Sequence, residues 1–176
     1  MSVGVPSARA LRALHRRCTE RLDDVPIPVP FDLARFCAAL SERRGRPIRV
    51  HAIASAPNAC GMWIATDAVD HVFHESATSL VHREHIVLHE LSHMLWGHDA
   101  GRLDGPWMAH LLPDLAPETV RRVLRRSDYS LEQEREAEVL ATLIAGRATR
   151  RSGRRELPAD LVAQRARLGT ALVEGE

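Results

Sequence analysis

The pentapeptide HELSH at positions 89–93 is the one stretch of this chain whose residue types and spacing indicate a specific chemistry. Residues four apart in an α-helix lie on the same face, with Cβ atoms about 6 Å apart. Two imidazoles so placed, His89 and His93, can bind one metal ion, and Zn²⁺ is the usual occupant of this pattern. Glu90 adjoins the first histidine, where its carboxylate can take a proton from a water on the metal. The motif therefore predicts a zinc peptidase centre with His89 and His93 as ligands and Glu90 as the catalytic base.

The residues around the motif predict a buried helix that positions it. Apolar side chains occur on most sides of this segment (Ile86, Val87, Leu88, Leu91, Met94 and Leu95), which is typical of a helix within a core. Thr78 or Ser79 can cap its start, and Gly97 can end it in a left-handed conformation. The expected helix has about 17 residues. Histidines and a glutamate buried there need a compensating partner, and a metal ion would supply one.

A catalytic zinc site takes three protein ligands and keeps a fourth position open. Asp99 and His98 follow the motif closely and remain possible third ligands, although Trp96 stands where related patterns have a glycine that turns the chain back. Glu136 is the favoured ligand. It belongs to a helix predicted from Ser130 to Ile144.

The predicted glutamate helix begins with a capping box formed by Ser130 and Gln133. Glu136 lies one turn before Leu140 on the apolar side, so we expect its carboxylate to point into the core. The other acidic residues of the helix are expected to be solvated: Glu132, Glu134 and Glu138. Packed against the motif helix, such a helix would complete a gluzincin-like site.

Two further residues near the motif are weaker candidates. His85 lies one turn before His89 and could orient it. Tyr129 precedes the glutamate helix and could stabilise an oxyanion. Both residue types are more common as plain core or surface residues.

Three segments resemble the ImmA/IrrE-type zinc metallopeptidases. They are HIVLHELSHMLWGH at 85–98, EAEVLA at 136–141, and the strand pair expected at 61–73. The resemblance implies an HExxH hydrolase whose third zinc ligand is the leading glutamate of the second segment, Glu136. It also implies a regulatory protease in transcription or stress control, with a protein substrate such as a helix-turn-helix repressor. Glu138 and Leu140 stand where that family usually has Asn and Phe.

Composition limits the class of protein. The formal net charge of +1 argues against direct nucleic-acid binding. Cys18, Cys37 and Cys60 are widely spaced and form no CxxC, as expected for free thiols in a reducing compartment. We find no apolar stretch of signal-peptide or membrane-span character. The expectation is a cytoplasmic protein without membrane contact, and its oligomeric state stays open.

The element order predicts an α+β fold: a small zincin-like domain, mainly helical, with a short mixed or antiparallel sheet beside the HExxH helix. Helices are expected over 8–22 and from Asp32 to about 41, and strands over 48–53, 61–66 and 71–74, the last two as a hairpin. Further helices are expected near 108–112, 118–126 and 158–172, and a basic linker over 147–155. We expect one domain over 1–150 (N-terminal helices 8–41, core 45–148), followed by a basic linker and helical tail over 151–176.

Two functions are therefore in competition. The first is a zinc-dependent cytoplasmic endopeptidase acting on a specific protein. The second is a non-catalytic zincin-fold module that binds a regulator or toxin partner. The intact Glu90 favours the enzyme, because a purely structural metal site has no need of a general base.

Overall fold

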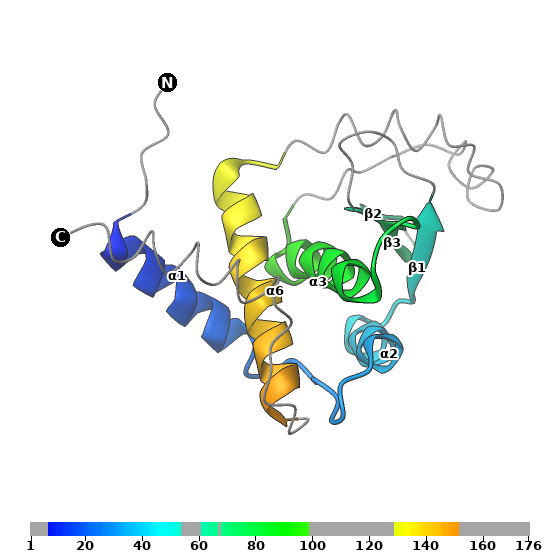
Figure 1. Cartoon of the computed structure of the whole chain (residues 1–176), viewed down its shortest axis with the longest axis horizontal. Coiled ribbons are helices and arrows are strands. Elements are labelled where there is room, and N and C mark those ends of the chain that lie inside the picture. The colour runs from blue at the N-terminus through cyan, green and yellow to red at the C-terminus, as the bar shows by residue number, and fades with distance from the viewer. Residues whose placement is uncertain (1–6, 54–60, 67, 99–128, 152–176) are drawn as a thin grey trace.

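The computed structural model of the chain describes residues 7–53, 61–66, 68–98 and 129–151. In this part of the chain the elements follow in the order α1 (Ala8–Arg21), α2 (Leu33–Arg44), β1 (Ile48–Ile53), β2 (Gly61–Ala65), β3 (Asp70–Glu75), α3 (Leu80–Trp96) and α6 (Leu131–Arg151). The fold class is α+β, as predicted, with helices grouped beside a small sheet (Figure 1). The helices predicted at 108–112, 118–126 and 158–172 lie outside the described residues.

The sheet is mixed, with the strand order β1-β3-β2. β2 and β3 pair antiparallel, which confirms the predicted pairing, whereas β1 runs parallel to β3. β3 is therefore the central strand, and β1 and β2 form the two edges. Successive strand side chains point to opposite faces. Trp63 and Val72 face the main core, so their neighbours Phe73 and His71 face the other side of the sheet.

Helix α3 carries the HELSH motif, and it has the length and the caps that its sequence predicts. It spans 17 residues, and the Ser79 side chain accepts a hydrogen bond from the backbone N–H of His82. Gly97 ends it in the left-handed region at φ 71°, where a residue without Cβ is favoured. The helix is buried along most of its length, so its position relative to the sheet and to α6 is set by packing.

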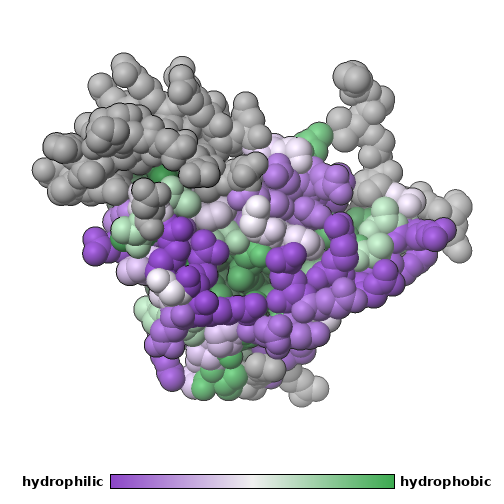
Figure 2. All heavy atoms as spheres, turned by 180° about the vertical axis from the view of Figure 1, so that it is seen from behind, coloured by the Kyte–Doolittle hydropathy of each residue, from purple (hydrophilic) through white to green (hydrophobic). Residues whose placement is uncertain are grey.

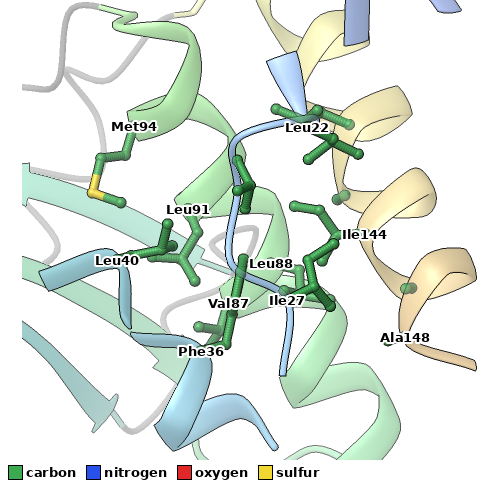
Figure 3. Packing of buried hydrophobic residues seen from close by; sticks show 14 of the residues in the cluster. Leu22, Ile27, Phe36, Leu40, Val87, Leu88, Leu91, Met94, Ile144 and Ala148 are labelled. Atoms are coloured by element: carbon green, nitrogen blue, oxygen red, sulfur yellow. The ribbon is translucent and has the colours of Figure 1, made fainter. Parts of the chain in front are cut away.

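Helix α6 packs against both α3 and α1. Its start has the predicted capping box, because Ser130 N–H donates to Gln133 Oε1 and Gln133 N–H donates to Ser130 Oγ. Its apolar side joins α1, α2, α3 and one face of the sheet in a single core (Figure 3). The most deeply buried members include Leu22, Phe36, Leu40, Val87, Leu88, Leu91, Leu140 and Ile144.

The prediction of a basic linker from residue 147 is wrong at its start, because α6 continues to Arg151. Arg147 makes contacts with α1 from this added part of the helix. Its guanidinium donates to the carbonyls of Leu22 at 2.9 Å and Thr19 at 3.3 Å, and it lies 3.3 Å from the Asp23 carboxylate. These contacts tie the last turns of α6 to the end of α1.

Cys18 and Cys37 are free, buried thiols, as expected, while Cys60 lies outside the described residues. Across the described segments, no helix has both the length and the apolar character needed to cross a bilayer. Polar residues cover much of the face shown in Figure 2, with apolar side chains between them.

Candidate metal centre

The two motif histidines lie in the second half of α3, and the Nε2 atoms of their rings point towards each other. His89 Nε2 and His93 Nε2 are 3.1 Å apart, and the ring planes are nearly perpendicular. The His93 side chain is fully buried, and that of His89 is 19% exposed. The i, i+4 spacing thus brings both imidazoles to one point, as predicted.

Glu134 of α6 completes the group. Its Oε2 lies 3.2 Å from His89 Nε2, and its Oε1 lies 3.8 Å from His93 Nε2. A tetrahedral Zn²⁺ with ligands at about 2.0–2.1 Å requires ligand atoms about 3.3–3.4 Å apart. The three separations of 3.1, 3.2 and 3.8 Å bracket this value. Among the described residues, the metal-binding group of three or more His, Cys, Asp or Glu side chains is His89, His93 and Glu134. The donor set therefore fits a divalent ion.

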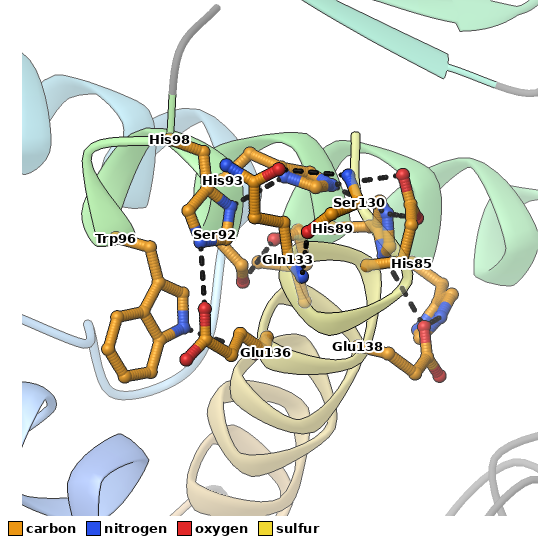
Figure 4. A network of polar contacts seen from close by, with 12 residues as sticks. His85, His89, Ser92, His93, Trp96, His98, Ser130, Gln133, Glu136 and Glu138 are labelled. Carbon is orange, nitrogen blue, oxygen red and sulfur yellow. Dashed lines mark hydrogen bonds and ion pairs between the residues drawn. The ribbon is translucent and has the colours of Figure 1, made fainter. Parts of the chain in front are cut away.

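The structure places Glu136, the ligand predicted from the sequence, beside this group rather than within it. Its carboxylate is buried, as its place on the apolar side predicted, but it lies between two other partners. Oε1 is 3.0 Å from the Arg17 guanidinium of α1, and Oε2 is 3.1 Å from His98 Nε2 (Figure 4). His98 in turn approaches Nδ1 of His93, on the opposite side of that ring from Nε2. Asp99 lies outside the described residues.

The expectation that Glu138 is solvated is wrong, because its side chain is only 24% exposed and approaches His89. The Glu134 side chain is 45% exposed, as expected, but it also approaches His89. A signal for this was present in the sequence. Glu134 precedes the wholly buried Ala137 and Ala141 by one and two turns, so it shares their face of α6.

Glu90 is buried between α3 and β2. It is only 6% exposed, and its Oε2 has no hydrogen-bond partner among the described residues. Burial raises the pKa of Glu90 to about 7, against the lowering effect of His89 and of the Trp63 backbone. The carboxyl group has little spare room, because a Cβ on Gly61 would lie 2.8 Å from its Oε1. A carboxylate with a free oxygen and a pKa near neutrality has the properties of a general base.

The outer nitrogens of both imidazoles are also paired. Nδ1 of His89 lies 3.4 Å from Glu138 Oε2, which is 3.2 Å from His85 Nε2. Nδ1 of His93 lies 2.8 Å from His98 Nδ1. His85, the weaker candidate from the sequence, lies two contacts from the metal group, through Glu138 and His89.

These pairings set the charge of each ring. Burial lowers the pKa of His89, but its hydrogen bonds with Glu134 and Glu138 outweigh burial and raise that pKa to about 10. Burial and the neighbouring imidazoles lower the pKa of His93 to about 3. The group therefore holds one neutral ring and one that attracts a cation, either a proton or a metal ion.

Tyr129, which immediately precedes the capping box, lies flat against His93. The ring centroids are 3.7 Å apart and the planes differ by 14°. Its hydroxyl is buried and has no partner among the described residues. The aromatic face of Tyr129 thus packs against one side of the site.

A separate histidine pair lies on the sheet. His51 Nε2 of β1 and His71 Nδ1 of β3 are 3.0 Å apart, and the His51 ring stacks on Phe73. Burial and the neighbouring His51 lower the pKa of His71 to about 4. This pair belongs to the packing of the sheet face that points away from the main core.

Comparison with protein-family models, with curated proteins and with solved structures finds no match for this chain. The case for its function therefore depends on the site itself.

Proposed function

We propose that this protein is a zinc-dependent endopeptidase with a small zincin-like fold. His89, His93 and Glu134 would hold the ion, and Glu90 would act as the general base. The observation that carries the proposal is the convergence of two imidazole nitrogens and one carboxylate, at 3.1 to 3.8 Å from one another, next to a buried carboxyl group with a free oxygen.

A bound zinc ion would supply Lewis acidity, which makes a water nucleophilic near neutral pH and polarises a peptide carbonyl. Glu90 supplies the proton transfers: its carboxylate takes a proton from the attacking water and returns it to the leaving amine. The apolar surroundings of Glu90 keep its pKa near the working pH. Tyr129 can donate its unpaired hydroxyl to the oxygen on which negative charge develops.

The resemblance of 85–98 and 136–141 to ImmA/IrrE-type peptidases supports a substrate class. On that basis the substrate is a specific cytoplasmic protein such as a helix-turn-helix repressor, and activity on unrelated peptides is expected to be low. An extended substrate could pair with β2, because this edge strand runs next to Glu90.

Zinc content and cleavage test the proposal in two steps. The purified chain should bind one zinc ion, and Glu134→Gln should lose it, because the amide replaces a charged ligand. Glu132→Gln is the matched control, since this exposed residue lies on the same helix. Binding that survives Glu134→Gln unchanged would exclude Glu134 as the ligand.

In the second step, the chain is incubated with candidate helix-turn-helix repressors, and products are identified by mass spectrometry. Glu90→Gln should keep zinc and lose at least about 100-fold in rate, because it removes the proton acceptor without changing size. Stoichiometric zinc and tight binding of the repressor without proteolysis would instead support the non-catalytic module.

A further inference from the structure

The outer nitrogens of the two histidines suggest why α6 carries acidic residues at 134, 136 and 138. A neutral imidazole has one proton and one lone pair. If Nε2 gives its lone pair to a metal ion, the proton must be on Nδ1. The structure gives the Nδ1 atoms of His89 and His93 different partners, and each partner restricts where that proton can be.

Glu138 is the partner of His89. A carboxylate only accepts hydrogen bonds, so the contact of 3.4 Å between Glu138 Oε2 and His89 Nδ1 places the proton on Nδ1. His85 Nε2 approaches the same oxygen at 3.2 Å and holds the carboxylate in position. In the metal-free structure Nε2 of His89 shares a proton with Glu134 Oε2 at 3.2 Å. A metal ion would displace that proton and leave the one that Glu138 holds on Nδ1.

For His93 the same result follows through an intermediate ring. Glu136 Oε2 can only accept, so the proton of a neutral His98 must be on the Nε2 that lies 3.1 Å from it. His98 Nδ1 is then an acceptor, and the 2.8 Å contact with His93 Nδ1 requires His93 to donate. Arg17 lies 3.0 Å from the other oxygen of Glu136 and forms an ion pair with that carboxylate.

Helical geometry explains how one helix supplies both partners. At 100° per residue, Glu134 and Glu138 lie about 40° apart, whereas Glu136 lies on the opposite side of α6. Glu138 therefore reaches His89 directly, while Glu136 reaches His93 only through His98, beyond the end of α3 (Figure 4).

We propose that Glu138 and the His98–Glu136 pair are positioning residues that hold the Nδ1 protons of His89 and His93, so that both Nε2 atoms face the metal ion. The inference rests on the proposed zinc site. Outer-shell partners of this kind typically change metal affinity by about 10- to 100-fold.

The test uses the full chain with Zn²⁺ as the probe. Glu138→Gln and Glu136→Gln keep side-chain size but add an amide donor, so each should weaken zinc binding about 10- to 100-fold, measured by competition with a chromophoric chelator. Glu132→Gln is the control and should bind as the wild type does. Metal-free thermal unfolding shows whether each variant is folded. Should Glu138→Gln fail to fold, Glu138→Asp retains an acceptor and should preserve the Nδ1 proton.

Long-range ¹H–¹⁵N NMR of the zinc-loaded histidines separates positioning from general stabilisation. Glu138→Gln should shift the Nδ1–H signal of His89 and leave that of His93, and Glu136→Gln should do the reverse through His98. Wild-type affinity and unchanged signals in both variants would overturn the inference while leaving the zinc site intact. Ligation through Nδ1 would overturn it as well. A wild-type chain that binds no zinc would overturn the proposed function and this inference together.

Discussion

Gly61 controls how much room the proposed general base has, and a single methyl group tests this. In Gly61→Ala, the new Cβ would lie 2.5 Å from Ile86 Cγ2, 2.8 Å from Glu90 Oε1 and 3.1 Å from Glu90 Cγ. Carbon contacts begin near about 3.5 Å, so Ile86 must move by about 1 Å and the Glu90 carboxyl group by about 0.7 Å. Both side chains are buried, which leaves few directions for that movement.

Two effects should follow from Gly61→Ala. Overpacking of this kind destabilises by about 1–3 kcal/mol, which lowers the melting temperature. A displacement of about 1 Å costs a catalytic group about 100-fold in rate, so the smaller shift of Glu90 should cost about 10-fold. Zinc binding should be unaffected, because the three atoms nearest to the new methyl group belong to Ile86 and Glu90 and not to His89, His93 or Glu134.

The assay compares repressor cleavage, zinc stoichiometry and thermal unfolding for the wild type, Gly61→Ala and Gly146→Ala. Gly146 is the matched control: the atoms nearest to a Cβ there belong to the movable end of Arg150, the first at 3.3 Å, and alanine favours the helix by about 0.5–1 kcal/mol. If Gly61→Ala cleaves at the wild-type rate and melts at the same temperature, Glu90 does not occupy the confined position described above.

Two further predictions concern stability. The pKa of His71 is lowered to about 4 in the folded chain, so the unfolded chain binds a proton first as pH falls. The contribution of neutral His71 to the free energy of unfolding is therefore complete above about pH 6.5 and declines towards pH 4. The expected decline is about 1–2 kcal/mol after allowing for solvent screening. Urea unfolding from pH 7.5 to 4.5 should show a larger loss in the wild type than in His71→Gln, whose remaining loss comes from other buried histidines such as His93. Equal pH dependence in both would contradict the prediction. Arg147→Ala removes the hydrogen bonds to the end of α1 and should cost about 1–3 kcal/mol, whereas the exposed Arg150→Ala should change little. Equal unfolding midpoints for these two variants would show that the contacts of Arg147 add no stability.

Local signals allowed much of the fold to be predicted. The bounds of α3 follow from a capping serine, an apolar periodicity and a terminal glycine, all of which act within one turn of the helix. The capping box at Ser130 is equally local. By contrast, the parallel pairing of β1 with the central strand β3 depends on contacts between distant parts of the chain, which no short-range pattern specifies.

The candidate site divides in the same way. His89 and His93 are placed by one helix, so their meeting point could be predicted from the spacing alone. The third member of the group, which is acidic, comes from α6, and this helix packs on two sides, against α3 and against α1. Periodicity indicated correctly that Glu136 points inward, but it could not indicate which neighbour lies there. In the structure that neighbour is Arg17, and the face towards α3 carries Glu134.

The two helices that supply the metal-binding group are far apart in the sequence and meet only in the folded chain. An ion held by His89, His93 and Glu134 would therefore act as a removable cross-link between them. Binding would raise the free energy of unfolding by RT ln(1 + [Zn²⁺]/Kd). The cellular supply of zinc would thus set both the number of competent molecules and how long each one resists unfolding.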